Sequence, residues 1–272
     1  MSGAVDPVPE ALEAELLDVA RAAARVAAAE LLARYEHTAQ GLDTKTTATD
    51  PVSDADRAAE AAIRALLAER RPGDAILGEE GGETAATREG SGVRWVVDPL
   101  DGTVNYLFRY PQWSVSVAAE DADGTALAGV VLDPLRDEEL SATRSGPLLR
   151  DGAPVAQQPR AATLDVALVA TGFGYDAAVR ARQADVLRDM LPRVRDVRRG
   201  GSAALDLAWT ALGRCDAYWE RGVKAWDVAA GGLLCARAGL ELRELPAADG
   251  MPPGLLAAPP ALAGELLALV SP

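Results

Sequence analysis

The segment from Arg94 to Leu107, RWVVDPLDGTVNYL, restricts what this chain can fold into more than any other part of it. Its apolar start, Trp95 to Val97, predicts a buried β-strand that delivers Asp98 at its end. Pro99 disfavours a helical conformation for Asp98 and keeps that residue extended. Asp101 follows three residues later, so two carboxylates converge at one point beside apolar structure.

The residues after this acidic pair predict an anion-binding backbone. Gly102 lets the chain turn, and Thr103 opens a predicted short helix, whose free N–H groups favour phosphate. Carboxylates alone would repel a phosphate, so cations must lie between them, and oxygen ligands of this kind suit Mg²⁺. The alternative is a plain Asp-Pro turn with an N-cap aspartate.

Two further acidic positions lie at the ends of predicted elements. Glu79 and Glu80 follow the short apolar strand Ala75 to Leu77, and Asp227 opens an apolar helix from Trp226. Taken singly, the first pair is typical of a solvated loop and Asp227 of a helix N-cap. Together with the first acidic pair, they predict one multi-metal centre.

The composition excludes several other classes of protein. A net charge of −14 argues against a surface for nucleic acid or an anionic membrane, and no apolar run approaches the length of a membrane span. The N-terminus has no basic or apolar signal-peptide pattern, and two cysteines among 272 residues indicate a cytoplasmic location. His37 is the single histidine, at a predicted helix end, so a two-His zinc site is impossible.

The order of predicted helices and strands changes near the middle of the chain. An α+β first half is predicted at residues 1–152, which carries most of the acidic positions, and an α/β second half at 153–272. In the first half Ser53 and Asp56 form a capping-box pattern after a polar loop at 41–52. The predicted helices are 10–35, 55–70, 177–190, 203–212, 226–238 and 261–269; the predicted strands include 75–77, 94–97, 113–119 and 126–132.

The strings GEE, WVVDPLDGTVNY and AWDVAAGG, in this order, resemble the inositol monophosphatase family of Mg²⁺-dependent sugar phosphatases. The resemblance runs from about Leu12 to the last helix. It implies a layered αβαβα sandwich of the inositol monophosphatase and fructose-1,6-bisphosphatase type. It also implies a homodimer.

The resemblance further implies a catalytic centre holding two or three Mg²⁺ ions. Asp56 would accept a hydrogen bond from Thr103, and Thr103 and Glu79 would orient a metal-bound water. Asp98 would bridge two ions, and Leu100 would contribute its backbone carbonyl. The implied metal ligands are Glu79, Asp98, Leu100, Asp101 and Asp227.

A substrate side is implied in the same way. Gly102 and Thr103 would give backbone N–H groups to the phosphate, and Glu220 would contact substrate hydroxyls. Lys45 matches a lysine of a loop near the metals, whereas the role of Lys224 stays open. The sugar-lining segment is matched by Gly201, Ser202 and Ala203.

The implied activity is that of a phosphoric monoester hydrolase. The preferred substrate is myo-inositol 1-phosphate, and inhibition by Li⁺ is implied as well. Histidinol phosphate, fructose 1,6-bisphosphate, nucleotide 3′-phosphates and NADP are the alternative substrates, because a fold does not fix a substrate. A non-catalytic metal-binding regulator that kept the fold is the alternative of a different class.

Two short strings suggest rival phosphatase chemistries. The run from Asp121 to Thr125, DADGT, matches haloacid-dehalogenase-like enzymes, which use the first aspartate as nucleophile. Its setting instead predicts a hairpin turn between two strands. Cys215 and Arg221 have the spacing of a cysteine phosphatase, but the bulky residues between them do not suit a phosphate cradle. Asp151 and Gly152 predict another hairpin turn.

Overall fold

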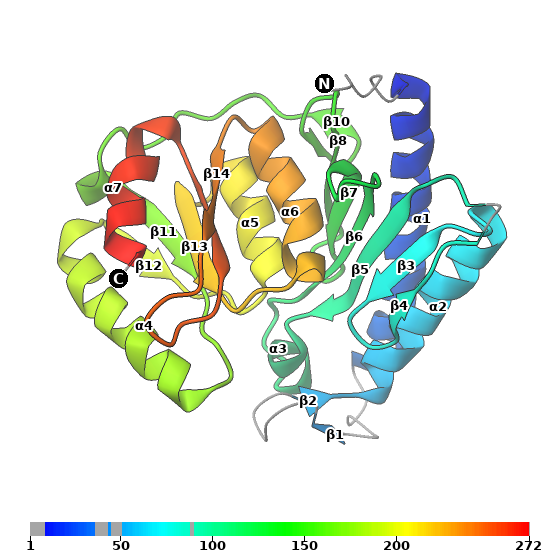
Figure 1. The fold of residues 1–272 in the computed structure, drawn as a ribbon, viewed down its shortest axis with the longest axis horizontal. Helices are drawn as coiled ribbons and strands as arrows, with labels where there is room; N and C mark the ends of the chain where they lie inside the picture. Colours follow the sequence, from blue (N-terminus) through cyan, green and yellow to red (C-terminus); the bar gives the residue numbers. More distant parts are fainter. Residues whose placement is uncertain (1–8, 36–42, 45–50, 88–89, 272) are drawn as a thin grey trace, which may run out of the picture.

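A computed structural model describes residues 9–35, 43–44, 51–87 and 90–271. Two large β-sheets stand side by side, with one pair of helices between them and a pair outside each (Figure 1), and strands β1 (Asp43–Thr44) and β2 (Pro51–Val52) form a separate two-stranded sheet. The five layers confirm the expected αβαβα sandwich. The helices are α1 (Glu10–Tyr35), α2 (Asp54–Arg70), α3 (Thr103–Leu107), α4 (Ala177–Met190), α5 (Ala203–Leu212), α6 (Ala225–Arg237) and α7 (Pro260–Val270).

The first sheet has eight strands in the order β10-β9-β8-β7-β6-β5-β3-β4. Only β3 and β5 pair in parallel, so both strands end at the same edge. Helices α1 and α2 cover the outer face through a stripe of alanine and leucine. The strands are β3 (Ala75–Gly78), β4 (Gly82–Thr84), β5 (Arg94–Asp101), β6 (Ser114–Glu120), β7 (Ala126–Asp133), β8 (Glu138–Thr143), β9 (Leu149–Arg150) and β10 (Ala153–Pro154).

The second sheet has five strands in the order β12-β11-β13-β15-β14. Strand β11 pairs in parallel with both neighbours, and β15 pairs antiparallel with both of its own. Helices α4 and α7 cover its outer face (Figure 1). Its strands are β11 (Leu168–Thr171), β12 (Asp196–Arg198), β13 (Ala217–Arg221), β14 (Glu241–Leu245) and β15 (Gly254–Ala258).

The central layer of α5 and α6 packs against both sheets, which explains why these helices are apolar on most sides. A close approach makes this possible. A Cβ added at Gly129 of β7 would lie 3.0 Å from the Cα of Ala230 on α6. Because Gly129 has no side chain, α6 can lie directly on the first sheet.

Most elements agree with the sequence predictions. Helix α1 has the predicted bounds, and the Asp151-Gly152 turn has positive φ at both residues, +51° and +79°. Such a turn matches the twist of the two strands that it joins. Strands β4 and β8 were not predicted, and β4 lies in what we expected to be loop. Short strands β1 (Asp43–Thr44) and β2 (Pro51–Val52) lie within the predicted polar loop, most of which is outside the described residues.

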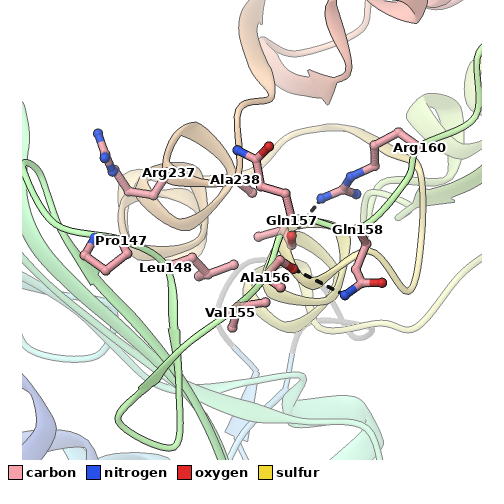
Figure 2. Close-up of a pocket in the computed structure, with 10 residues that line it drawn as sticks. Pro147, Leu148, Val155, Ala156, Gln157, Gln158, Arg160, Arg237 and Ala238 are labelled. Atoms are coloured by element: carbon pink, nitrogen blue, oxygen red, sulfur yellow. Dashed lines mark hydrogen bonds between the residues drawn. The ribbon is translucent and has the colours of Figure 1, made fainter.

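A connecting segment links the two sheets between Pro154 and Leu164. Arg160 fixes it to the end of α5, donating to the carbonyls of Thr210, Ala211 and Cys215. A cavity of about 250 Å³ lies beside this contact, and no acidic side chain lines it (Figure 2). The boundary at 152/153 stays a prediction; β10, at 153–154, still pairs with the first sheet.

Within the described residues, no helix combines the length and the apolar character that crossing a membrane requires.

Candidate metal centre and substrate cavity

The acidic pair of the sequence lies on an irregular stretch of β5. Asp98 pairs with Ser116 of β6 and Asp101 with Ser114, so three steps on one strand face two on the other. In a regular strand, residues three apart point to opposite faces. The irregularity turns both carboxylates into one cavity, with Leu100 between them.

Three carboxylates form a compact cluster. Asp98, Asp101 and Asp227 each place one oxygen within 4.8 Å of the others. Asp227 comes from the other half of the molecule, in the first turn of α6, where it accepts a 2.6 Å bond from the backbone N–H of Lys224. The backbone N–H of Leu100 donates to Asp98 at 3.0 Å. The sequence prediction that these aspartates meet is confirmed.

The cluster carries unbalanced negative charge. Burial raises the pKa of Asp98 and of Asp227 well above their ordinary value, and neighbouring carboxylates raise both further. Burial also raises the pKa of Asp101 to about 6, although hydrogen bonds from Ser202 and the start of α5 oppose the shift. In the part of the chain that the structure describes, no arginine or lysine side chain pairs with any of the three aspartates.

This donor set fits Mg²⁺. Buried carboxylates without a basic partner require a cation, and an all-oxygen set is what Mg²⁺ prefers. Glu79 follows β3 at the same sheet edge, lines the same cavity, and its charge helps to raise the pKa of Asp98. Leu100 also lines the cavity, and its carbonyl oxygen lies 3.2 Å from the Thr103 hydroxyl oxygen. Asp98, Asp101, Asp227, Glu79 and the Leu100 carbonyl would hold the ion or ions.

Thr103 and Asp56 form a buried pair beside the cluster. The Thr103 hydroxyl donates to Asp56 Oδ1 at 2.9 Å. Asp56 is fully buried, and its other oxygen accepts from the backbone N–H of Ser53 at 2.9 Å and from the Ser53 hydroxyl at 2.5 Å. The predicted capping box therefore holds the carboxylate that orients Thr103. Because the proton of Thr103 is turned to Asp56, its oxygen presents a lone pair to the cavity.

Asp101 is bound to the second half of the molecule. Its Oδ2 accepts from the Ser202 hydroxyl at 2.6 Å and from the backbone N–H of Ala204 at 2.7 Å, at the start of α5. This corrects our expectation for Ser202. The residue is fully buried and its side chain does not line the cavity, since the hydroxyl is used by Asp101. Gly201 and Ala203, on either side, do line it.

The cavity has a volume of about 450 Å³ and extends from the aspartates to β13 and α4. Glu220 of β13 lines it and accepts a 3.0 Å bond from the Tyr218 hydroxyl. Burial raises the pKa of Glu220 to about 7. A Cβ at Gly172 would lie only 2.0 Å from the Glu220 carboxylate, so only glycine leaves room for that side chain.

The remaining predicted residues divide into two groups. Gly102, in a left-handed conformation with φ +100°, and Lys224 line the cavity. Lys45 and His37 lie outside the described residues.

Neither rival phosphatase motif has the geometry of a site. Asp121 accepts from the backbone N–H groups of Asp123 and Thr125 and pairs with Arg144, which makes it the anchor of a hairpin turn at the far end of β6. Cys215 is buried, and burial raises its pKa to about 11, so the thiol is not an activated nucleophile. Arg221 donates to backbone carbonyls in the protein interior.

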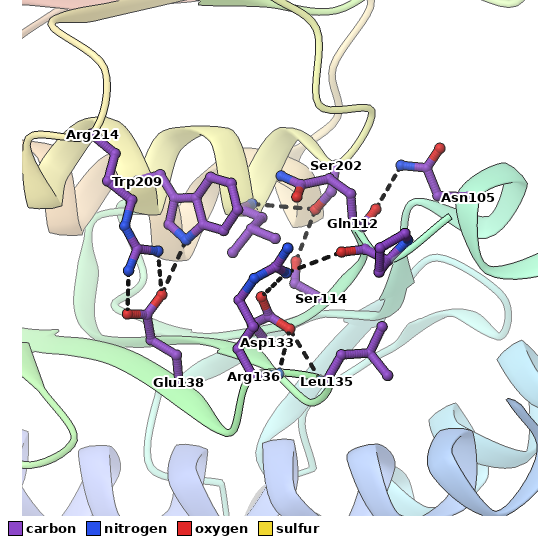
Figure 3. Close-up of polar contacts among 12 residues, drawn as sticks. Asn105, Gln112, Ser114, Asp133, Leu135, Arg136, Glu138, Ser202, Trp209 and Arg214 are labelled. Atoms are coloured by element: carbon purple, nitrogen blue, oxygen red, sulfur yellow. Dashed lines mark hydrogen bonds and ion pairs between the residues drawn. The ribbon is translucent and has the colours of Figure 1, made fainter. Parts of the chain in front are cut away.

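Sequence reasoning missed the polar residues that join the two halves beside the cluster. Asn105 donates to the carbonyls of Gln112 at 2.6 Å and Gly200 at 2.9 Å, and so ties the loop before α5 to the first half (Figure 3). Ser114 contacts the Ser202 hydroxyl at 3.0 Å. No local pattern marks these residues, because their partners in the second half, Gly200 and Ser202, lie 95 and 88 residues away.

Comparison with known proteins agrees with this geometry. The chain is 46% identical over 230 residues to the inositol-1-monophosphatase SuhB of Mycobacterium tuberculosis, a match that covers 82% of this chain and 79% of that protein. It is 42% identical over 199 residues to a Pseudomonas aeruginosa protein named Nus factor SuhB, with 71% of each chain covered.

The fold is also that of solved structures. The extragenic suppressor protein SuhB of Bartonella henselae matches with a TM-score of 0.83 and 32% identity, over 93% of this chain and 96% of that one. The sequence signature described as the inositol monophosphatase family spans residues 12–271. With the acidic strings, the layered fold and the relatives in agreement, this chain belongs to the inositol monophosphatase family.

Proposed function

We propose that this protein is a Mg²⁺-dependent phosphomonoesterase that hydrolyses a small sugar or polyol phosphate, with myo-inositol 1-phosphate as the preferred substrate. One observation carries the proposal. Asp98, Asp101 and Asp227 meet without a basic partner among the described residues, directly beside the oriented hydroxyl of Thr103. Family membership and the names of the M. tuberculosis relatives support the same assignment.

The residues of this chain divide the chemical work. Mg²⁺, when bound, would lower the pKa of a water, neutralise phosphate oxygens and stabilise the departing alkoxide. Thr103 Oγ1, whose own proton is donated to Asp56, would accept a hydrogen bond from the attacking water and so point a lone pair of the water toward phosphorus. Glu79, at the same cavity, orients the water from a second side. Attack in line with the leaving oxygen then follows without a covalent intermediate.

The opposite wall of the cavity favours a polyhydroxylated leaving group. Glu220 can accept hydrogen bonds from substrate hydroxyls, and Tyr218 together with Gly172 fixes where its carboxylate lies. The backbone of Gly102 and Thr103 would bind the phosphate, and that of Gly201 and Ala203 would lie along the sugar. Histidinol phosphate, fructose 1,6-bisphosphate, nucleotide 3′-phosphates and NADP remain the competing substrates within the same site.

A regulatory role without catalysis is the second candidate, because a relative carries the name Nus factor. A protein that only binds partners has no need of Thr103 held by Asp56 next to the acidic cluster. Those contacts are all present. A net charge of −14 also disfavours direct contact with nucleic acid.

Phosphate release from the candidate substrates, compared by kcat/KM at saturating Mg²⁺, tests the proposed function. We expect the highest value for myo-inositol 1-phosphate, and no release after EDTA treatment until Mg²⁺ is restored. The Asp98→Asn variant serves as the control for contaminating phosphatase. Release that persists in EDTA, or equal release by Asp98→Asn, contradicts the proposal.

We also propose a homodimer located in the cytoplasm. Phe108 and Tyr110 follow α3 and are 82% and 56% exposed, although each is a large aromatic side chain. The family resemblance implies a homodimer, and we propose that a second copy of the chain covers this exposed aromatic pair. Light scattering at micromolar concentration should give twice the mass of 28.3 kDa, and Phe108→Ser with Tyr110→Ser should give the single mass.

A further inference from the structure

We propose that Ser114 and Ser116 of β6 are positioning residues that hold two of the metal ligands, Asp101 and Asp227, in place across the joint between the two halves. This inference rests on the proposed function. Neither serine touches the cavity, and both are fully buried. Each acts through a hydrogen bond to the half of the molecule that carries α5 and α6.

The contact of Ser114 with Asp101 runs through Ser202. The hydroxyl of Ser202 accepts from the backbone N–H of Leu205 at 3.3 Å and donates to Asp101 at 2.6 Å. A hydroxyl has one proton to give, so in the 3.0 Å contact between the two serines Ser114 is the donor and Ser202 the acceptor (Figure 3). Ser114 thereby fixes the rotation of the hydroxyl that holds Asp101.

The contact of Ser116 with Asp227 is through the backbone. The Ser116 hydroxyl donates to the carbonyl of Trp226 at 3.0 Å, and Trp226 directly precedes Asp227 in the first turn of α6. That carbonyl is joined by one peptide bond to the residue whose carboxylate enters the cluster. Its position fixes how far α6 can slide along the first sheet.

The alternation of valine and serine along β6 indicates that the two serines do more than fill space in the core. Val115 and Val117 point into the core under α1, whereas Ser114 and Ser116 point toward α5 and α6. Apolar side chains would be the ordinary choice against those apolar helices, because a buried hydroxyl must find a partner. Both serine hydroxyls have a hydrogen-bond partner in the half that carries α5 and α6. In the pairing of β6 with β5, Ser114 lies opposite Asp101 and Ser116 lies opposite Asp98.

Binding of Mn²⁺ alone to the metal-free protein tests the inference, because Mn²⁺ prefers the same oxygen ligands and can be followed by electron paramagnetic resonance without substrate. Loss of a hydrogen bond behind a metal ligand commonly weakens metal binding about 10- to 100-fold. We expect Ser114→Ala and Ser116→Ala each to raise the Kd for Mn²⁺ by that factor. We further expect kcat to recover largely at high Mg²⁺, since no reacting group is lost.

Ser141→Ala provides a matched control. Ser141 is a fully buried serine on β8, where it accepts from Arg21 at 2.9 Å on the α1 side of the sheet. Its loss should leave the Kd for Mn²⁺ within twofold of the wild type. An equal weakening by Ser141→Ala would show general loosening of the sheet and would overturn the positioning role.

The outcomes separate this inference from the proposed function. If the wild-type protein binds Mn²⁺ and both serine variants bind it equally well, the positioning role is wrong and the phosphatase assignment stands. If the wild-type protein binds no Mn²⁺, both are wrong. Should either alanine variant fail to fold, Ser114→Cys or Ser116→Cys keeps the volume but weakens the hydrogen bond, and the same rise in Kd is expected.

Discussion

The hydroxyl of Thr103 and the carboxylate of Asp56 are joined by a 2.9 Å hydrogen bond across 47 residues of chain. Asp56 belongs to the first turn of α2 and also closes the capping box of that helix through Ser53. One side chain therefore sets the start of a helix and the direction of the hydroxyl beside the acidic cluster. Local stability and the geometry of the site are coupled through Asp56.

Thr103→Ala should lower kcat with myo-inositol 1-phosphate by about 100- to 10,000-fold, the range typical for a side chain that assists proton movement in the transition state. The Mg²⁺ concentration for half activity should change little, because Thr103 contributes no carboxylate. Thr103→Ser keeps the hydroxyl and should retain most of the activity. Steady-state phosphate release measures both variants, and a Thr103→Ala enzyme with wild-type kcat would remove Thr103 from the mechanism.

Asp98→Asn should reduce turnover by about 1,000-fold or more, because a bound metal contributes several kcal/mol to stabilising the transition state. The same change should raise the melting temperature of the EDTA-treated protein, since it removes one of several repelling carboxylates. Differential scanning calorimetry with and without Mg²⁺ checks both effects. A metal-free variant that is less stable than the wild type would mean that Asp98 has a structural partner.

The stability of the metal-free protein should fall as the pH rises. The pKa of Asp101 is about 6 in the folded protein against an ordinary value of 3.8, so folding favours the protonated form. Its stabilising contribution is complete below about pH 3.8 and is lost as the pH rises through about 6. We expect the melting temperature in EDTA to fall by several degrees between pH 5 and pH 8.

Mg²⁺ should reverse this trend. Because protons compete with the ion for the same carboxylates, the rise in melting temperature on adding Mg²⁺ should be larger at pH 8 than at pH 5. In Asp101→Asn the dependence on pH should be flatter. A stabilisation by Mg²⁺ that is equal at the two pH values would contradict the metal assignment of Asp101.

Glu220→Gln should lower kcat/KM for inositol 1-phosphate about 10- to 100-fold, the usual effect of losing a charged hydrogen-bond acceptor. An aryl phosphate without hydroxyls should be hydrolysed as by the wild type. The pKa of Glu220 is about 7, so its ionised form is lost as the pH falls through that value. In the wild type, the ratio of kcat/KM for the polyol phosphate to kcat/KM for the aryl phosphate should therefore decline as the pH falls through about 7. In Glu220→Gln this ratio should not change with pH in that range.

Li⁺ should inhibit uncompetitively with respect to substrate at millimolar concentrations. If the proposed two or three ions share Asp98, Asp101 and Asp227, they cannot all have ideal octahedral surroundings, so one should be held weakly. Li⁺ has a similar radius and half the charge, and in that place it would hinder the release of phosphate. Initial rates with Li⁺ and substrate both varied test this. Purely competitive inhibition would place the weakly held ion elsewhere.

The elements that the sequence predicts well are those whose pattern is local. Helix α1 repeats leucine and alanine at helical spacing, and its bounds agree with the prediction. Strand β8 was missed because Glu138 and Glu139 occupy buried positions in it. Glu138 pairs with Arg214 beyond α5 (Figure 3). Glu139 pairs with Arg21 of α1. Such compensation by distant partners leaves no mark on the local pattern.

The same reason limits prediction of the site. The acidic positions could be found because each follows a strand or opens a helix, and the family strings fixed which of them belong together. Ser202 could be placed near the site but not assigned to Asp101, since its partner lies 101 residues away. A serine near the site can either line the cavity or support a residue that lines it. The sequence is the same in both cases, and only the three-dimensional structure distinguishes the two roles.

The irregular pairing of β5 has a consequence for protein engineering. If residues 98–101 of β5 paired regularly with β6, one of the two aspartate side chains would point to the opposite face of the sheet. Redesign that rewards ideal strands would therefore regularise this stretch and separate the carboxylates that form the acidic cluster. The irregularity lies in an otherwise regularly paired strand, so automated stabilisation of this protein should leave residues 98–101 and their partners on β6 unchanged.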